Sequence, residues 1–503
     1  MSINTAQSRD TRPQIEVIEG IGANDFPALM AQTPLQFAHL FASLAAAGRD
    51  SADTGKNTAR WSILLAAPES ELRLSGDGVL GGAALKPIAA PAANVPELNI
   101  SGMSFPNTHF LGAWAQWVAQ HPGLASDFST ELPFVGGWSF YLSYELAEHI
   151  EPSVHLPHFA PADRVGFPVA MAQYHAAALL FDHQTATTYL VHDGRHPATV
   201  AAIKAAILGF SPAPMAVGEL VIEGLQADDS ARYQAGVQQI LDYLRAGDVF
   251  QANLSRAWRF HAPQVDAGER IFQRLAQYNP APFAAWYRLA EGQIISSSPE
   301  RLADHIAGSV STRPIAGTRR RDADSVRDHA LQAELRAHPK ERAEHVMLID
   351  LERNDLGRVC QPGSVQVDEF MVLESFAHVH HLVSNVRGQL HPSHSVFDLL
   401  AAVFPGGTIT GCPKVRCMEI LAELEQTGRG PYTGSVGYVS LDGRMDSNIL
   451  IRTVFLAADG VGEFRTGAGI VIDSDPLRET AETEEKARGL LLALTEPTDS
   501  VPQ

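Results

Sequence analysis

The sequence predicts an α+β fold in which β-sheets are covered by helices. Helical and strand-like segments alternate along the chain, but without the strict strand–helix–strand rhythm of a parallel sheet. Apolar residues make up 45% of the 503 residues, which is enough for a sizeable core. No repeat with a period of roughly 20–50 residues is visible, which argues against a solenoid.

The first part of the chain combines short apolar runs with connectors rich in Gly and Pro. Residues 1–14 are polar and are expected to form a tail, whereas residues 15–210 are expected to form the N-terminal region of the fold. Runs such as 61–66 and 176–181 have the composition of strands. Residues 87–96 are rich in Pro and Ala, which predicts a loop.

Residues 211–225 are the predicted linker, because two Pro and one Gly lie near their start, and a second region is predicted at 226–497. A helix is predicted between a cap at Asp228–Ser230 and Gly247, since its apolar residues recur at helical spacing. A strand with one polar face is predicted at 250–254, where apolar and polar residues alternate.

Further elements of the second region follow from the same signals. Residues 326–351 are predicted to form one long helix, or two helices separated near Pro339. Residues 407–425 are predicted to form a loop that opens into a helix, with Pro413 at the first helical position. Two strands are predicted at 434–457, with a turn at 442–443, and a terminal helix is predicted at 476–494. These signals make the second region the better defined of the two.

The charge balance is acidic, with 38 Lys and Arg against 57 Asp and Glu, a formal net charge of −19. No basic cluster longer than Arg319–Arg321 occurs, so the chain lacks the basic surface typical of nucleic-acid-binding proteins. The acidic excess serves mainly solubility. An anionic substrate would therefore be bound by a few local cations and helix ends.

Cysteine usage and apolar patterning indicate a cytoplasmic protein. Cys360, Cys412 and Cys417 are too few for a disulfide framework, and no Cys-x-x-Cys pair is present for zinc. Residues 1–12 lack the apolar core of a signal peptide. No apolar run reaches the roughly 20 residues of a membrane span, so no membrane association is expected.

Two Glu-x-x-Glu pairs are candidate metal ligands. Glu341 and Glu344 form one pair, and Glu479 and Glu482 form the other, with Lys486 four residues further on. A spacing of three places both carboxylates on one face of a helix. Two such helices facing each other could bind one Mg²⁺, which prefers oxygen ligands. The alternative is a solvated acidic face in which lysine pairs with glutamate.

Two further candidates lie beside predicted strands. Glu300, in Ser298-Pro299-Glu300, follows a strand-like run at 293–297, and a buried glutamate there could act as a general acid. Arg452 is predicted to lie in a strand, where its guanidinium could bind a carboxylate through two hydrogen bonds. The alternative for Glu300 is an exposed turn residue, and the alternative for Arg452 is an ordinary surface arginine.

A histidine cluster and a glycine-rich loop complete the candidates. His378, His380 and His381 lie in a strand-like run, in which His378 and His380 would share one face; with no cysteine nearby, zinc is not expected. Residues 404–414 are rich in glycine and precede a helix, whose N–H groups suit an anion, although phosphate-loop spacing is absent. Cys412 could be a catalytic thiol, but a small buried residue is the preferred interpretation.

Several of these segments resemble the motifs of chorismate-utilising enzymes. The most informative is Thr312-Arg313-Pro314-Ile315-Ala316-Gly317-Thr318, and the segment at 379–384 and the glycine-rich loop match as well. The resemblance extends from about Tyr233 to Leu494 and, more weakly, into the N-terminal region. It implies the fold of anthranilate synthase component I, in which two large, mostly antiparallel sheets pack as a sandwich with helices outside. Residues 226–497 would be the chorismate-binding catalytic region.

The resemblance also implies roles for individual residues. Glu300 would be the acid or base that helps the C4 hydroxyl leave the chorismate ring, and His381 would face the substrate, while His378 and His380 would be structural. The other implied positions are Ala316 and Thr408 among the catalytic positions; Gly317, Gly407, Tyr432, Arg452, Gly469 and Lys486 in substrate binding; and Glu341, Glu344, Glu479 and Glu482 as ligands of Mg²⁺.

Within this family the position of Ala316 distinguishes two groups of synthases. Anthranilate synthases carry alanine there and admit ammonia, whereas most aminodeoxychorismate synthases carry a lysine whose amine attacks the ring first. Lys340–His345, Ser384–Gly388 and Gly430–Tyr432 also resemble anthranilate synthases. The segments that resemble aminodeoxychorismate synthases are Phe250–Leu254, Ala281–Phe283, Ser298–Arg301, Val379–Leu382, Phe404–Gly407 and Ile409–Gly411.

Because the second set would contact the substrate more directly, the favoured function is aminodeoxychorismate synthase component I, in a variant without the lysine. It would make 4-amino-4-deoxychorismate, for 4-aminobenzoate and folate biosynthesis, from chorismate and from ammonia supplied by a glutaminase subunit. Anthranilate synthase component I, in tryptophan biosynthesis, is the alternative, and a non-catalytic chorismate-binding paralogue is a third. Tryptophan binding is not expected, because Leu64–Ser70 has the Glu-Ser of the tryptophan-binding segment displaced.

Overall fold

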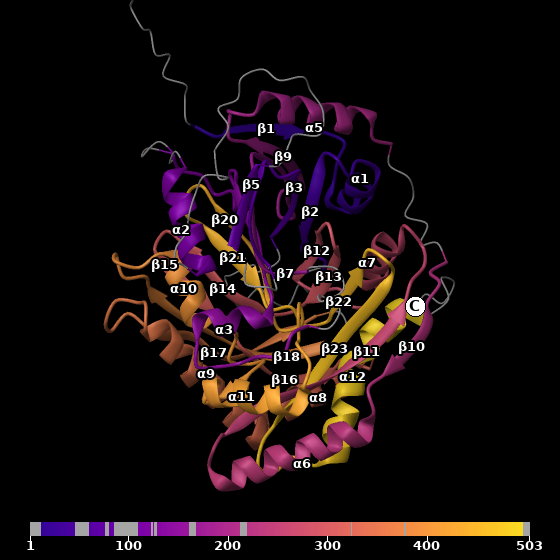
Figure 1. Ribbon diagram of the computed structural model, residues 1–503, viewed down its shortest axis with the longest axis vertical. Coiled ribbons are helices and arrows are strands. Elements are labelled where there is room, and N and C mark those ends of the chain that lie inside the picture. The colour runs from indigo at the N-terminus through magenta and orange to yellow at the C-terminus, as the bar shows by residue number, and fades with distance from the viewer. Residues whose placement is uncertain are drawn as a thin grey trace, which may run out of the picture.

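Two large antiparallel sheets form the centre of the molecule, and helices cover them (Figure 1). The computed structural model describes residues 12–45, 60–75, 80–84, 109–121, 124, 128–159, 167–211, 219–322, 324–376 and 379–495. Residues 1–11 of the predicted tail, the predicted loop at 87–96, residues 212–218 of the predicted linker, and His378 lie outside these ranges. The predicted α+β class, with two large antiparallel sheets, is confirmed.

The sheets pack face to face, and helices lie against their outer faces. Tyr141 and Met171 of one sheet contact Ile294 and Phe455 of the other in a buried apolar layer. Ile295 points the opposite way and packs with helical residues in a separate cluster, as the alternation of a strand requires. The result is a sandwich of two sheets between two helical layers.

The first sheet contains strands from both regions of the sequence. Its order is β1 (Gln14–Ile18), β9 (Thr187–His192), β8 (Ala177–Asp182), β3 (Trp61–Ala66), β2 (Phe37–Ala42), β12 (Phe283–Arg288), β13 (Gly292–Ser298), β22 (Thr453–Ala457), β23 (Val461–Ile470), β11 (Gln251–His261) and β10 (Glu223–Ala227), with β19 (Gly411–Cys412) paired to β11. The pairing of β2 with β12 joins the two regions.

The second sheet joins the two regions in the same way, through β6 and β20. Its order is β16 (Ile315–Arg320), β18 (Val379–Gln389), β15 (Ser309–Thr312), β14 (Arg301–Ile306), β21 (Met445–Asn448), β20 (Ser435–Ser440), β6 (Gly137–Leu142), β7 (Pro168–His175), β4 (Ser70–Ser75) and β5 (Leu80–Ala84), with β17 (Gln366–Ser375) paired to β18.

The helices form the two outer layers. Against the first sheet lie α1 (Phe26–Gln32), α5 (Pro197–Gly209), α7 (Ala267–Tyr278) and α12 (Pro476–Thr495). Against the second lie α2 (Phe110–Gln120), α9 (Pro339–Gly357) and α10 (Val396–Val403). The remaining helices are α3 (Ala147–Ile150), α6 (Ser230–Ala246), α8 (Ser325–Ala337) and α11 (Lys414–Glu425). Figure 1 shows α5 and α6 at opposite ends of the molecule.

Most predicted elements are present, with local differences. The Asp229 carboxylate caps α6 by accepting from the Ala231 N–H at 2.9 Å, and Gly247 ends the helix with φ +83°. The segment at 326–351 contains two helices, and the second begins at Pro339. Proline has no backbone N–H, so it cannot continue the hydrogen bonding of the first helix. Pro413 is the residue before α11 and not its first residue.

The prediction of two strands at 434–457 was wrong. Three strands occur there, because β20 and β21 belong to the second sheet whereas β22 belongs to the first. The chain therefore crosses between the sheets at residues 449–452. Arg452 lies in this crossover, with φ +52°, and not in a strand as predicted.

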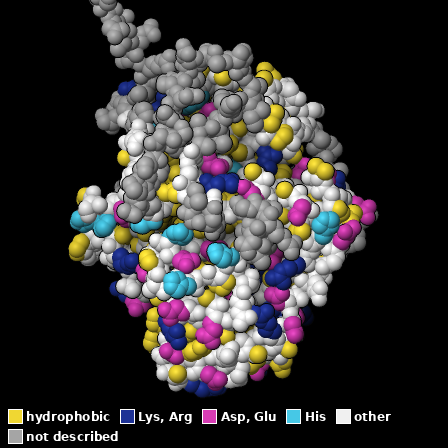
Figure 2. Space-filling view, viewed as in Figure 1, with side chains coloured by type: hydrophobic (Ala, Val, Ile, Leu, Met, Phe, Trp, Pro, Cys, Tyr) yellow, Lys and Arg dark blue, Asp and Glu magenta, His cyan; other side chains and the backbone are white. Residues whose placement is uncertain are grey.

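Surface charge and helix length agree with the composition. Figure 2 shows acidic and basic side chains interspersed over the face that it draws. Among the described helices, none combines the length and the apolar character that crossing a bilayer needs.

Candidate active site

Two crossovers between the sheets lie side by side and hold the main candidate residues. Glu300 follows Pro299 between β13 of the first sheet and β14 of the second, and Arg452 ends the crossover at 449–452. The Ile449 N–H donates to the Glu300 carbonyl at 3.0 Å, and the Ser297 N–H donates to the Arg452 carbonyl at 3.1 Å. Backbone hydrogen bonds therefore fix the two side chains relative to each other.

The Glu300 side chain is a buried carboxyl suited to hold a proton. The residue is 4% exposed, and its Oε1 has no hydrogen-bond partner within the described part of the chain. Burial raises the pKa of Glu300 to about 7, against the opposing effects of the Thr408 hydroxyl, the Ile315 N–H and the Lys486 ammonium. A carboxyl with such a pKa can act as a general acid at neutral pH.

His381 lies on β18, opposite Thr318 of β16. Burial lowers its pKa to about 3, and the positive charge of Arg452 contributes, whereas the backbone of Gly317 acts in the opposite direction. The imidazole is therefore neutral at physiological pH. His381, Arg452 and Gly317 are thus neighbours.

His380 points to the other side of β18. Its Nε2 lies 2.9 Å from Oδ1 of Asp328, and its Nδ1 lies 2.7 Å from Oγ of Ser375. Both ring nitrogens are engaged by protein groups.

Arg452 is a cation in a poorly solvated position. Burial lowers its pKa, and the neighbouring Tyr432 opposes that shift. Tyr432 is 6% exposed and follows Arg429, whose guanidinium lies over the Tyr432 ring at 5.6 Å. Arg452 is half-buried by solvent exposure, and a partly desolvated guanidinium favours an anionic partner whose geometry a carboxylate matches.

The glycine-rich loop at 404–414 packs against β11 and α9. A Cβ on Gly411, which has φ +128°, would collide with the carbonyl of Gln251. A Cβ on Gly407 would collide with Leu351. The Asn253 side-chain N–H donates to the Thr408 carbonyl at 3.2 Å, so the loop is held against β11 beside Glu300.

Glycines on β23 give space to two polar side chains of β11. A Cβ on Gly469 would collide with the Gln251 amide, and a Cβ on Gly467 would lie 2.5 Å from Asn253 Oδ1. Buried polar atoms without a hydrogen-bond partner in the described residues gather around this place. They are Gln251 Oε1, Asn253 Oδ1, Glu300 Oε1, Thr312 Oγ1 and Thr408 Oγ1. Buried polar groups are normally satisfied, so such a group of atoms indicates a binding site for a polar ligand.

One Glu-x-x-Glu pair lies on α9 and the other lies on α12. The Glu341 carboxylate accepts from Arg319 Nη1 at 3.0 Å and lies over Gly317, where its Oε2 would be 3.0 Å from an added Cβ. Glu482 pairs with Lys486 at 2.8 Å, and Lys486 also donates to the Gly467 carbonyl at 3.0 Å. Both helices therefore bring carboxylates to the border of the site.

These carboxylates have the chemistry that Mg²⁺ prefers. Within the described ranges no three His, Cys, Asp or Glu side chains are close enough to hold a metal ion as they stand. Mg²⁺, however, is commonly held by one or two carboxylates together with waters and substrate oxygens. Glu344 on α9 and Glu479 on α12, which is 5% exposed, complete the donor set.

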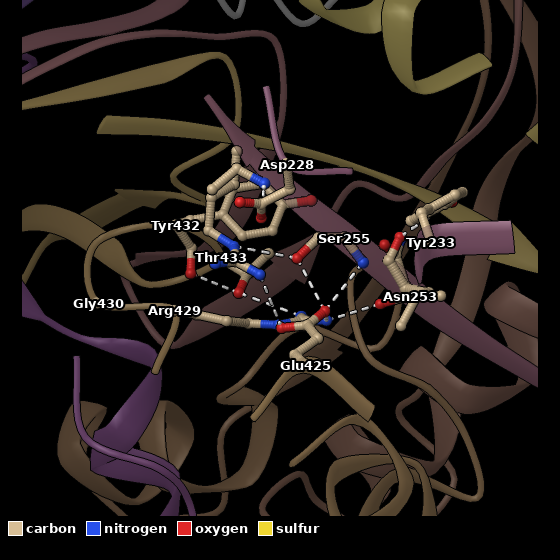
Figure 3. Close-up of polar contacts among 12 residues, drawn as sticks. Asp228, Tyr233, Asn253, Ser255, Glu425, Arg429, Gly430, Tyr432 and Thr433 are labelled. Atoms are coloured by element: carbon tan, nitrogen blue, oxygen red, sulfur yellow. Dashed lines mark hydrogen bonds and ion pairs between the residues drawn. The ribbon is translucent and has the colours of Figure 1, made fainter. Parts of the chain in front are cut away.

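Sequence reasoning missed a buried ion network behind Tyr432, which Figure 3 shows. The Glu425 carboxylate binds both Arg429 and Arg465, and Arg429 donates to the Asn253 carbonyl at 2.6 Å. A Glu and an Arg four residues apart resemble an exposed helical pair, so their spacing gave no signal of burial. A second missed group, Glu352, Asp355 and Lys414, lies behind Glu300.

The profile of the chorismate binding enzymes matches residues 103–492. An anthranilate synthase component I-like protein of Synechocystis sp. is 43% identical over 371 residues, 74% of this chain and 75% of that protein. Aminodeoxychorismate synthase component 1 of Klebsiella aerogenes is 41% identical over 372 residues, 74% of this chain and 80% of that protein. The structure of anthranilate synthase component I from Streptococcus pneumoniae superposes with a TM-score of 0.70 at 28% identity, covering 94% and 99% of the two chains.

Proposed function

This chain belongs to the family of chorismate binding enzymes, and we propose that it is aminodeoxychorismate synthase component I. It converts chorismate and ammonia to 4-amino-4-deoxychorismate, which leads to 4-aminobenzoate and folate. The ammonia comes from a separate glutaminase subunit, since the sequence has no Gly-x-Cys-x-Gly nucleophile segment. The observation that carries the proposal is the pair of crossovers that hold a protonated Glu300 near the half-buried Arg452.

Chorismate is a dianion, and the chain offers separate positive features for its two carboxylates. Arg452 and the backbone of the glycine-rich loop bind the enolpyruvyl carboxylate. Glu344 and Glu482, with Glu341 and Glu479 beside them, would hold Mg²⁺, which supplies positive charge to fix the ring carboxylate. Tyr432, Gly317, Gly407, Gly469 and Lys486 line the remaining sides of the bound ring.

Glu300 acts as the general acid. Its proton passes to the C4 oxygen, so the hydroxyl leaves the ring as water while the carbon–oxygen bond breaks. Thr408 lies near the Glu300 carboxyl, since its hydroxyl acts to lower the pKa of Glu300. The burial that raises the pKa of Glu300 also keeps water away from the reacting atoms.

Ala316 sets the order of nucleophiles. Residues 315–318 form an irregular stretch of β16, where the pairing register with β18 shifts beside His381. With alanine there, no covalent lysine adduct forms at this position. Ammonia, or another small nucleophile, opens the reaction at C2 before the amine is installed at C4.

Anthranilate synthase component I is the second candidate, and Ala316 is the feature that favours it. Retention of the amine at C2 would be followed by elimination of pyruvate to give anthranilate. In the anthranilate synthases, the histidine equivalent to His381 is associated with that elimination.

One assay separates these functions. The protein is incubated with chorismate, Mg²⁺ and ammonium, and anthranilate fluorescence is followed directly. We expect no anthranilate, and we expect 4-aminobenzoate only after an aminodeoxychorismate lyase is added. Direct appearance of anthranilate would establish the second candidate, and no consumption of chorismate would indicate a non-catalytic paralogue.

A further inference from the structure

In the glycine-rich loop at 404–414, the carbonyl groups of three successive residues, 406–408, each accept a hydrogen bond. The three hydrogen bonds run from Thr410 Oγ1 to the Gly406 carbonyl at 2.7 Å, from the Gly411 N–H to the Gly407 carbonyl at 3.0 Å, and from Asn253 Nδ2 to the Thr408 carbonyl at 3.2 Å. Of these three donors, Asn253 alone lies outside the loop, on β11. Its side chain therefore ties the orientation of the loop to the first sheet.

The N–H groups that follow these three carbonyls are left without an acceptor. They belong to Gly407, Thr408 and Ile409, which are buried, and none of them donates a hydrogen bond to another group in the described part of the chain. The peptide units are trans, so each carbonyl points away from the N–H of its own unit. Buried N–H groups are normally satisfied, and successive free N–H groups in a loop suit an anion.

Asn253 is itself firmly held. Its backbone N–H donates to the Thr410 carbonyl at 3.0 Å, and its carbonyl accepts from Arg429 at 2.6 Å (Figure 3). The residue is 8% exposed, and a Cβ on Gly467 would lie 2.5 Å from Asn253 Oδ1, so the side-chain amide has little room to rotate. Nδ2 therefore stays directed at the Thr408 carbonyl.

We propose that Asn253 is a positioning residue for substrate binding, which holds the Thr408 carbonyl so that the Ile409 N–H and its neighbours in the loop face the enolpyruvyl carboxylate of chorismate. This inference rests on the proposed function, in which the loop backbone binds that carboxylate. Without the Asn253 N–H donor, the peptide unit between residues 408 and 409 can rotate. The substrate must then order the loop, and this ordering weakens its binding.

The test uses Asn253→Leu in the full-length protein, because leucine has a similar size and no side-chain N–H. Asn253→Ala is the second variant, which removes the same donor without placing a branched side chain against Gly467. Asn354→Leu is the matched control, since Asn354 is exposed on α9. Thermal unfolding of the three variants reports whether any change disturbs the fold.

The first measurement is the Kd for chorismate, determined by calorimetry with Mg²⁺ and without ammonium, so that no amine is installed. The Kd should rise about tenfold in Asn253→Leu and in Asn253→Ala, which is the size of effect expected for one lost hydrogen bond. The Kd of Asn354→Leu should equal that of the wild type. An unchanged Kd in a folded Asn253 variant would overturn the proposal.

The second measurement separates KM from kcat while chorismate consumption is followed with Mg²⁺ and ammonium. The loop N–H groups contact the carboxylate before and during the reaction, so KM should rise about tenfold while kcat stays within about threefold of the wild type. A fall in kcat with an unchanged KM would overturn the positioning role.

The two proposals fail separately. If the wild type makes anthranilate, the proposed function is wrong, but the rise in KM still tests Asn253, because consumption does not depend on which product forms. If the wild type makes 4-amino-4-deoxychorismate and the Asn253 variants bind chorismate normally, only the role of Asn253 is wrong. A wild type that binds no chorismate would overturn both.

Discussion

The Arg429 guanidinium forms a two-pronged ion pair with the Glu425 carboxylate, although neither side chain is more than 3% exposed. The distances are 3.0 Å from Nε to Oε2 and 2.7 Å from Nη2 to Oε1. Arg465 approaches the same carboxylate at 3.2 Å. Burial alone would raise the pKa of Glu425, but the two guanidinium groups together hold it below its ordinary value.

This network connects three segments that border the candidate site. Arg429 donates to the Asn253 carbonyl of β11 and, at 3.1 Å, to the Ile409 carbonyl of the glycine-rich loop. The same residue begins the segment that leads to Tyr432. The network therefore fixes the positions of residues that the proposed function uses.

Glu425→Gln should destabilise the protein more than Arg429→Gln does. The first change leaves the Arg429 guanidinium buried without a carboxylate and leaves Arg465 with only its 3.9 Å ion pair to Glu463. The second change leaves a carboxylate that Arg465 still neutralises. Breaking a buried ion pair typically costs about 3–5 kcal/mol, so the urea midpoint of both variants should fall. Glu423→Gln, on the exposed face of the same helix, is the control. Equal stability of Glu425→Gln and the control would contradict the energetic importance of the network.

Glu300→Gln should lose activity and gain stability at alkaline pH. The pKa of Glu300 is about 7 in the folded protein against an ordinary 4.5, so the folded state binds the proton more tightly. Stability is therefore lost as pH rises from 4.5 to 7, and the full cost, about 3 kcal/mol, applies above pH 7. The Glu300→Gln variant does not have this cost, because a glutamine side chain does not ionise.

Unfolding of wild type and Glu300→Gln is compared at about pH 5 and about pH 8.5, and the stability difference should appear only at the higher pH. Wild-type kcat should fall as pH rises through about 7, because the reaction needs the protonated carboxyl. A pH-independent stability difference between the two proteins would mean that Glu300 does not hold its proton in the folded state.

The sequence predicted features that depend on local spacing. The strand-like run at 293–297 correctly preceded Glu300, and the three-residue spacing correctly placed Glu341 and Glu344 on one helix. Such signals survive because strand alternation and helical periodicity depend on near neighbours. The cap at Asp229 was predictable for the same reason.

The sheet crossover at 449–452 and the buried ion network were not predictable in this way. Residues 445–457 form a nearly continuous extended run that contains no Gly or Pro. No local turn signal therefore shows that the chain changes sheet before Arg452. Glu425 and Arg429 have the spacing of a solvent-exposed pair. Their burial is decided by β11 and β23, which lie far away in the sequence.

Glu344→Gln should abolish turnover that depends on Mg²⁺. Removing one carboxylate takes away a charged oxygen ligand that an amide replaces poorly. The measurement is kcat as a function of Mg²⁺ concentration, with calorimetry for Mg²⁺ binding to the protein. Glu485→Gln, exposed on α12, is the control and should behave as wild type. Unchanged Mg²⁺-dependent turnover in Glu344→Gln would remove the metal assignment.

Cys412→Ala should keep activity within about twofold of the wild type. Burial raises the pKa of the Cys412 thiol, and the charges of Asp350 and Asp355 add to that effect. Reactive cysteines have lowered pKa values instead. Alkylation by iodoacetamide should therefore be slow at pH 7. Rapid alkylation that abolishes chorismate consumption, together with an inactive Cys412→Ala variant, would restore the catalytic interpretation.

No covalent lysine adduct should form during turnover. Ala316 removes the family lysine, and Lys486, which borders the site, is paired with Glu482 at 2.8 Å and donates to the Gly467 carbonyl. An ammonium held in this way lacks the lone pair that a nucleophile needs. The protein is quenched during turnover, with and without borohydride, and its intact mass is measured. Ala316→Lys supplies the comparison, because position 316 lies in the irregular stretch of β16 that pairs with β18 between Val383 and His381. A mass increase on a lysine of the wild type would show that another residue replaces the family nucleophile, and ammonia would then not be the first group to reach C2.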